Sequence, residues 1–299
     1  MLAVFSLLVV ASTVSKIMAI KNPQTDHKEL RLRIKSWWVM IGILFTVLLS
    51  STGVAITFFG FLSFLMLKEF LSIVPTRFED RTVIFWAYAS IPIQYFWIYL
   101  EWYGMFIIFV PIFMLLILPM RMVLIGETKG FIRAAGVLNW TTMLSVFSIG
   151  HIAYLLVLPE KNLAAGNVGL VLFIRFMTQF NDSCQYVWGK KFGKHKIIPK
   201  VSPNKTWEGF LGGFATITLC STFVAPLLTP LTQLQGAGAG ALIGFSGFIG
   251  DVVISSVKRD LQIKDSGNLI PGHGGLLDRL DSLSYTAPLF FHYLYYLQY

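Results

Sequence analysis

Charged residues are scarce in this sequence. They make up 13% of the 299 residues, whereas hydrophobic residues make up 55%. A soluble domain usually carries about 25% charged residues, because its surface faces water. The mean hydropathy of +0.68 agrees with this reading. The composition therefore argues against an ordinary soluble domain and predicts an integral membrane protein whose natural solvent is the bilayer.

Cysteine is nearly absent as well. Cys184 and Cys220 lie in apolar surroundings and far apart in sequence, without the spacing of metal ligands. They are expected to be small buried residues. The apolar start of the chain, Met1–Ser15, lacks the basic residues that open a cleaved signal peptide. It is expected to form a first membrane span.

The apolar runs predict an all-α, polytopic transmembrane helix bundle of about 10 spans, with a range of roughly 8–10. The predicted spans are Met1–Ser15, Trp37–Ser51, Val54–Leu67, Val83–Leu100, Tyr103–Met120, Val137–Leu158, Val168–Trp188, Gly209–Leu228, Ala237–Ser256 and Leu283–Tyr299. The weakest is Val54–Leu67, which together with the run before it is compatible with a shallow hairpin.

The basic residues are segregated along the chain, whose net charge is +9. Of the 24 Lys and Arg residues, 22 lie in alternate loops, at 16–36, 68–82, 121–136, 189–208 and 257–282. Lys and Arg concentrate in the cytoplasmic loops of membrane proteins. These loops are therefore predicted to face the cytoplasm, and the charge needs no nucleic-acid partner. Anionic lipid heads or nucleotide phosphates are further partners for it.

Polar residues are concentrated after Val168. The prediction is an N-terminal transmembrane bundle at 1–167 and a catalytic region at 168–299, within one integrated domain. In the latter, Arg175, Gln179, Asp182 and Tyr186 share one face of a helix. A charged residue inside a span is costly and usually faces the bundle interior. The stripe fits either a functional site or an internal Arg–Asp pair.

Two further positions point to anion or cation binding. Ser202 and Pro203 suit the N-cap and first position of a helix, and Lys205 beside such a helix start makes an anion site. Asp251 stands in an apolar run, so its carboxylate needs either a basic partner or a metal ion.

The densest cluster of polar residues is the segment Ser255–Ser282. Its glycine-rich run, Pro271–Gly275, allows close approach of the backbone to a ligand. Asp278 and Asp281 follow at helical spacing, on one face of a predicted helix. The basic residues that can neutralise phosphates are Lys258, Arg259, Lys264 and Arg279. Together these features suit a divalent metal that bridges a polyphosphate.

At this point the chain resembles the CDP-diacylglycerol synthases (phosphatidate cytidylyltransferases). The matching signature positions are Ser255, Lys258, Arg259, Lys264, Asp265, His273, Gly274, Gly275, Asp278, Arg279 and Asp281. The stretch Ser202–Gly209 and the positions Asp182, Tyr186 and Gly189 resemble two upstream elements of that family. The segment Ser183–Tyr186 departs from the usual small residues and Ala-Tyr pair. It indicates a paralogous bacterial branch, which leaves the lipid acceptor open.

The resemblance implies that CTP and phosphatidic acid react to give CDP-diacylglycerol and pyrophosphate. The catalytic residues that it implies are Asp278, Asp281, Lys258, Arg259, Lys264 and Arg279. The substrate-binding residues are Ser202, Lys205, His273, Gly274, Gly275 and Asp182. Magnesium would be held by Asp278 and Asp281, with Asp251 assisting, and a second cation is compatible with the site. His273 is not assigned as a base, because a phosphate nucleophile is already ionised.

Other functions remain open at this stage. A paralogue would cytidylylate another lipid phosphate, such as a polyprenyl phosphate. A transporter would use the polar stripe as its path, but it predicts inverted repeats that the sequence does not show. The motif of CDP-alcohol phosphotransferases is not found. The expected location is the inner (cytoplasmic) membrane of a bacterium, among membrane lipids, with the active site facing the cytoplasm. A homodimer is compatible with the resemblance.

Overall fold

Helices form almost all of the regular structure in the computed structural model, which describes residues 9, 12–13, 28–162, 164–272 and 274–299. Within these ranges there is no strand, and two isolated bridges pair Lys196 with Thr206 and Ile270 with Gly274. The predicted all-α class is confirmed. Most of the predicted span Met1–Ser15 lies outside the described residues, and so does His273.

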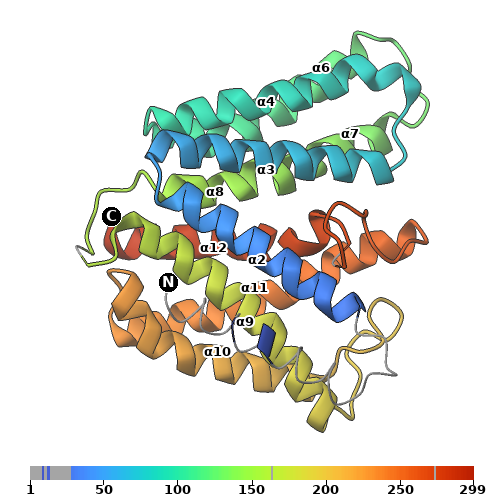
Figure 1. The fold of residues 1–299 in the computed structure, drawn as a ribbon. Coiled ribbons are helices and arrows are strands. Elements are labelled where there is room, and N and C mark those ends of the chain that lie inside the picture. The colour runs from blue at the N-terminus through green and yellow to red at the C-terminus, as the bar shows by residue number, and fades with distance from the viewer. Residues whose placement is uncertain (1–8, 10–11, 14–27, 163, 273) are drawn as a thin grey trace.

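The N-terminal helices form one group (Figure 1). They are α2 (Lys28–Leu48), α3 (Thr52–Ile73), α4 (Arg81–Tyr99), α5 (Tyr103–Ile108), α6 (Leu115–Val123), α7 (Phe131–Thr142) and α8 (Ser148–Leu155). A π-helical turn at Phe109–Met114 joins α5 to α6, and another at Met143–Phe147 joins α7 to α8. Each of these pairs is therefore one continuous helix with a wider turn inside it.

The C-terminal helices form a second group, which lies below α3, α4 and α8 in the view of Figure 1. They are α9 (Gly166–Phe192), α10 (Trp207–Leu228), α11 (Gln233–Asp260) and α12 (Leu277–Gln298). Glycines allow close helix contacts here. A Cβ atom on Gly209 of α10 would lie 2.8 Å from the Gln185 carbonyl and 2.9 Å from the Gly189 Cα of α9. Backbones that approach this closely leave no room for any side chain at position 209.

Aromatic residues fill the contact between the two groups. Phe106 of α5 and Phe291 of α12 are fully buried, and the Phe106 ring lies 4.6 Å from the ring of Tyr154 on α8. Nearby, the rings of Tyr103 and Tyr295 stack with centroids 4.3 Å apart. Aromatic side chains bury large apolar areas. The helix that carries Asp278 and Asp281 is therefore packed directly onto the N-terminal helices.

Four helices among the described residues are long and apolar enough to cross a membrane. They are Thr52–Ile73, Tyr103–Val123, Trp207–Leu228 and Gln233–Asp260. The first of them contains the weak predicted span Val54–Leu67, which is the middle of a 22-residue helix that is long enough to cross a membrane. The larger predicted number of spans and their orientation remain predictions.

Several helices run further than the apolar runs predicted. Helix α2 begins at Lys28 and not near Trp37, and α11 continues to Asp260. Parts of the predicted basic loops are therefore helical, because Lys and Arg are good helix formers and are favoured in a last turn. As a result, Lys258 and Arg259 project from the last turn of α11 at positions that the helix sets.

The guanidinium of Arg77 joins two of the predicted basic loops. The Arg77 guanidinium donates two hydrogen bonds to the Asp80 carboxylate, at 2.7 and 2.8 Å, and others to the carbonyls of Glu127 and Lys129. The hydrogen bonds to Asp80 raise the pKa of Arg77. The Asp80 side chain is only 1% exposed. The loops after α3 and α6 are thus held together at one end of the bundle.

Candidate active site

The predicted site residues gather where the ends of four helices meet. Asp182 lies in the second half of α9, ten residues before its end, and Lys205 lies just before α10. Asp251 lies in the last third of α11, and Asp281 lies in the first turns of α12. Because successive helices run in opposite directions, these four positions fall at the same end of the group. The structure therefore brings together residues that are up to 99 positions apart in the chain.

Asp251 has the basic partner that its apolar setting required. The Lys205 ammonium lies 2.6 Å from its Oδ2 atom, and the Ser255 hydroxyl donates to Oδ1 at 3.3 Å. Lys205 also donates to Gln185 Oε1 at 3.4 Å and lies over the Phe248 ring. These contacts hold the ammonium group between α9 and α11, beside the other carboxylates.

Three carboxylates lie close enough for their charges to act on one another: Asp182, Asp251 and Asp281. Ser282 links two of them, since its hydroxyl donates to Asp182 Oδ1 at 3.1 Å and its N–H donates to Asp281 Oδ1 at 2.7 Å. Gly250 makes the approach possible, because a Cβ atom there would lie 2.6 Å from the Asp281 carbonyl. Among the described residues, neither Asp182 nor Asp281 has an ion-pair partner.

The polar stripe of α9 is only partly buried. Arg175 makes no direct ion pair with Asp182 in the described structure, and instead donates to the Arg279 carbonyl at 3.4 Å. Tyr186 is 65% exposed. The buried polar face of α9 consists of Thr178, Asn181 and Gln185. The predicted stripe is displaced from that face by one residue, about 100° around the helix, and so lies along its edge.

A second cluster surrounds Asp278, which is 7% exposed. The Lys258 ammonium lies 2.7 Å from Asp278 Oδ1. The Oδ2 atom accepts from the N–H groups of Ser266 and Gly275, at 2.9 and 3.1 Å, and from the Ser266 hydroxyl at 3.0 Å. Both carboxylate oxygens are therefore engaged by the protein, and Asp278 holds the chain on either side of the glycine-rich turn.

The glycines of this turn fit around the carboxylate. Gly274 has a φ of +78°, in the left-handed region that favours glycine. A Cβ atom on Gly274 would lie 2.8 Å from Asp278 Oδ2. Gly275, a substrate-binding residue in the prediction, donates its N–H to Asp278.

The predicted helix start at Ser202 and Pro203 is wrong. Helix α10 begins at Trp207, and the Thr206 hydroxyl caps it by accepting from the Gly209 N–H at 3.2 Å. Across the turn that contains Ser202, the Ile197 N–H pairs with the Lys205 carbonyl. The residues between them form turns, in which the Ser202 N–H donates to the Ile198 carbonyl and the Lys205 N–H donates to the Ser202 carbonyl, and the helix begins only after the extended residue Thr206.

Three other predicted basic residues take different positions. Arg259 donates to the Val201 carbonyl at 3.1 Å, which fastens the loop next to Ser202 onto the end of α11. Lys264 is exposed in the loop between α11 and α12. Arg279 has its Nε atom buried without a hydrogen-bond partner among the described residues. Arg279 and Lys264 are thus the predicted cations least engaged with the protein itself.

Sequence reasoning missed Glu69, a residue of the N-terminal group. Its carboxylate accepts hydrogen bonds from the Leu276 and Leu277 N–H groups at 2.8 and 3.0 Å, and from the Ser266 hydroxyl. The available signal was the pair Lys68 and Glu69, the only charges in the otherwise apolar helix α3. Such charges usually mark a function or a partner.

The predicted magnesium ligands are only partly gathered. Among the described residues, no three Asp, Glu, His or Cys side chains converge into a ready metal site. The chemistry of the donors around Lys205 nevertheless fits a divalent cation. Asp182, Asp251 and Asp281 bring carboxylate oxygens from three helices, and such oxygens are the ligands that magnesium takes together with substrate phosphates.

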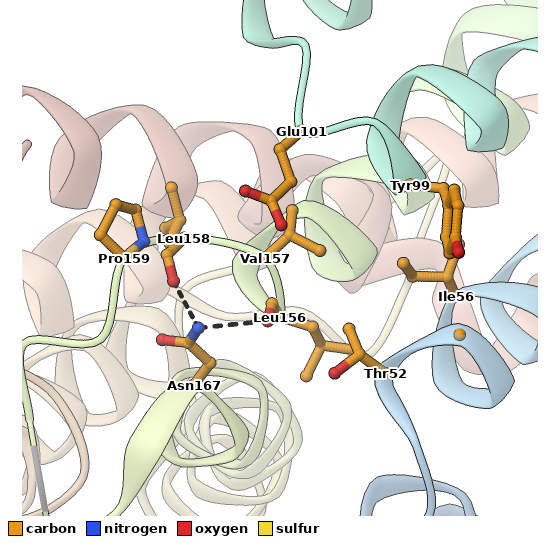
Figure 2. A pocket seen from close by; sticks show the side chains of 10 residues that line it. Thr52, Ile56, Tyr99, Glu101, Leu156, Val157, Leu158, Pro159 and Asn167 are labelled. Atoms are coloured by element: carbon orange, nitrogen blue, oxygen red, sulfur yellow. Dashed lines mark hydrogen bonds between the residues drawn. The ribbon is translucent and has the colours of Figure 1, made fainter.

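A cavity of about 610 Å³ lies at the start of α3, at the end of that helix opposite to Glu69 (Figure 2). Thr52, Glu101 and Asn167 line it, and the Asn167 amide donates to the carbonyls of Leu156 and Leu158. Helix α3 rises about 25 Å between Thr52 and Glu69. The cavity is therefore remote from the carboxylate cluster and contributes no residue to it.

Comparisons with known proteins identify the relatives of the chain. The model of the cytidylyltransferase family matches residues 31–297. The uncharacterized protein YnbB of Escherichia coli (strain K12) is 43% identical over 292 residues, which cover 98% of this chain and 96% of that protein. The phosphatidate cytidylyltransferase of Mycobacterium leprae (strain TN) is 41% identical over 135 residues, 45% of this chain and 42% of that enzyme. The phosphatidate cytidylyltransferase of Staphylococcus aureus (strain COL) is 39% identical over 129 residues, 40% of this chain and 46% of that enzyme. The alignments with both of these enzymes span less than half of their length.

Proposed function

Because the chain belongs to the cytidylyltransferase family and is a CTP-dependent nucleotidyltransferase, we propose that it transfers the cytidylyl group of CTP to phosphatidic acid. The observation that carries this proposal is the cluster of Asp182, Asp251 and Asp281 with Lys205 at the meeting point of four helices. Carboxylates beside cationic groups suit a reaction between two phosphates and a divalent ion. Membership of this enzyme family leaves the transporter alternative without support.

In the proposed reaction, a phosphate oxygen of the lipid attacks the α-phosphorus of CTP. A new P–O bond forms, the bond to the β-phosphate oxygen breaks, and pyrophosphate leaves with that electron pair. The products are CDP-diacylglycerol and pyrophosphate. The attacking oxygen is already ionised, so no strong general base is needed. Catalysis then consists of holding two anions in line and offsetting their repulsion.

The residues have different roles in this proposal. Asp182 and Asp281, which have no ion-pair partner among the described residues, would hold magnesium, and Asp251 would assist when Lys205 turns from it to a phosphate; the bound ion would neutralise phosphate charge. Asp278 anchors the glycine-rich turn, because its two oxygens are already engaged by Lys258, Ser266 and Gly275. The phosphate-binding cations are Lys205, Arg279 and Lys264, with Ser202, Arg259, Gly274 and Gly275 framing the site.

The identity of the lipid acceptor is the most specific part of the proposal. Identity with the two phosphatidate cytidylyltransferases covers less than half of this chain, whereas the relative that matches over 98% of it is uncharacterized. A paralogue that uses another lipid phosphate is therefore the second candidate. In either case we place the enzyme in a bacterial cytoplasmic membrane, with the site facing cytoplasmic CTP. A homodimer is part of this proposal only by likeness to the family.

The test is an assay of the purified protein in mixed micelles. The micelles contain CTP, magnesium and either phosphatidic acid or a polyprenyl phosphate, and the assay measures the CDP-lipid and pyrophosphate. We expect CDP-diacylglycerol from the wild type, and its loss in Asp281→Asn but not in the control Glu79→Gln, an exposed residue of the loop before α4. Product from the polyprenyl phosphate alone would establish the second candidate. Bound CTP without product from either lipid would refute both.

A further inference from the structure

The start of α12 lacks a cap from its own segment. The N-cap residue is Leu276, which has helical backbone angles and no side-chain hydrogen bond to the helix. The first four N–H groups of a helix have no partner inside it, and leaving them unpaired in a buried place is costly. Leu276 and Leu277 are both buried, so their N–H groups need an acceptor from elsewhere.

Glu69 supplies that acceptor from the N-terminal half. Its Oε2 accepts from the Leu276 N–H at 2.8 Å, and its Oε1 accepts from the Leu277 N–H at 3.0 Å. A carboxylate at this position also faces the positive end of the α12 dipole. Glu69 therefore binds the first turn of the helix that carries Asp278 and Asp281, from 207 positions earlier in the chain.

The same carboxylate reaches the anchor of the glycine-rich turn. The Ser266 hydroxyl contacts both Glu69 Oε1 and Asp278 Oδ2. A Cβ atom on Gly275 would overlap Glu69 Oε1, and one on Gly267 would lie 3.5 Å from its carboxyl carbon. The absence of a side chain at Gly275 thus makes room for the Glu69 carboxylate, which packs directly against the glycine-rich turn.

Helix α2 holds the turn from another side. The Ser36 hydroxyl donates to the Pro271 carbonyl at 2.7 Å, and the Arg33 Nε–H donates to the Gly272 carbonyl at 3.1 Å. Gly272 has a φ of +75° and packs against Arg33. The turn before α12 is therefore clasped between two N-terminal helices, α2 and α3.

We infer that Glu69 is a positioning residue of the active site, through which the N-terminal half sets the place of α12 and of the glycine-rich turn. The inference rests on the proposed function, because it assigns Glu69 to the site of cytidylyl transfer. Glu69 acts through Asp278, Ser266 and the first turn of α12. Its loss would shift Asp281 against the residues on α9 and α11, and small shifts of reacting groups cost rate more than binding.

The test compares Glu69→Gln with the matched control Glu79→Gln. Glutamine keeps the size of the side chain but loses the charge and directs an NH₂ group at a backbone N–H. We expect kcat to fall by about tenfold or more, as the loss of a charge-assisted hydrogen bond implies, while KM for CTP stays within about twofold. Glu69→Asp should recover part of the rate, and the control should match the wild type. A wild-type kcat in Glu69→Gln, or a rise in KM alone, would overturn the inference.

Trypsin gives a readout that does not depend on activity. Lys264 is exposed in the loop that Glu69 holds, and cleavage after it reports how often that loop opens. We expect Glu69→Gln to be cut there at least about fivefold faster than the wild type and the control, at equal thermal stability of the bundle. If the wild type makes no CDP-lipid but this difference in cleavage is seen, the proposed function fails, while the role of Glu69 in holding the loop is supported. Equal cleavage rates in all three proteins would refute the positioning role of Glu69, whatever their activity.

Discussion

Replacing Asp278 by Asn separates an anchoring role from a metal-binding role. Asp278 is 7% exposed and accepts from the Lys258 ammonium, the Ser266 N–H and hydroxyl, and the Gly275 N–H. An amide retains one acceptor oxygen and turns an NH₂ group toward groups that are themselves donors. Breaking a buried pair by neutralising one partner costs about 3–5 kcal/mol. We therefore expect Asp278→Asn to lose about 3–5 kcal/mol of stability, or about 5–10 °C in melting temperature.

Asp281→Asn is the matched comparison, one turn further along α12. Asp281 has like charges nearby on Asp182 and Asp251 and no ion-pair partner among the described residues. Removing its charge relieves repulsion, so the melting temperature should not fall by more than about 2 °C. Melting of both variants in detergent, beside the CTP assay, gives the answer. The reasoning is refuted if Asp278→Asn melts with the wild type, or if Asp281→Asn is the variant that unfolds.

Three more predictions follow from the described contacts. Gly209→Ala should force α10 away from Gly189 and lower the free energy of unfolding by about 1–3 kcal/mol. Gly136→Ala should leave the stability unchanged, because no atom lies within 4 Å of the new methyl group. Equal melting temperatures of the two variants would contradict this. Asp80→Asn should lower the free energy of unfolding by about 3 kcal/mol, because the Arg77 guanidinium loses its charged partner, and should leave the kcat of the folded fraction unchanged. A loss of kcat at normal stability would contradict this prediction. Removal of divalent metal by a chelator should abolish product and restoration of magnesium should recover it, and turnover that persists in chelator would exclude the magnesium role.

The sequence was sufficient for the helical class and for the central cluster. Apolar runs give the helix positions because helices in a bilayer must bury their backbone groups internally. Motif positions singled out Asp182, Lys205 and Asp281, and an apolar setting singled out Asp251. The structure brings these residues together. Helix ends were less predictable. Ser202 and Pro203 have good capping chemistry, but pairing across their own turn moves the start of α10 to Trp207.

The partners of the site residues could not be read from the sequence. Asp278 has the residue type and spacing of a metal ligand, and only the fold shows that Lys258 and two backbone N–H groups occupy it. Glu69 carries no motif and lies about 200 positions away from the groups that it binds. Long-range contacts of this kind depend on how α3 packs beside α12, which local periodicity does not specify.

The wide separation of Glu69 from Leu276 also bears on biosynthesis. A ribosome delivers α3 to the membrane long before α12 exists, since 207 positions separate the carboxylate from the N–H that it accepts. Until α12 emerges, Glu69 is a charged side chain near the end of an apolar helix without its partners on that helix. The active site can therefore assemble only after α12 has been added. A chain truncated before residue 276 would leave Glu69 without these backbone partners at the end of an apolar helix.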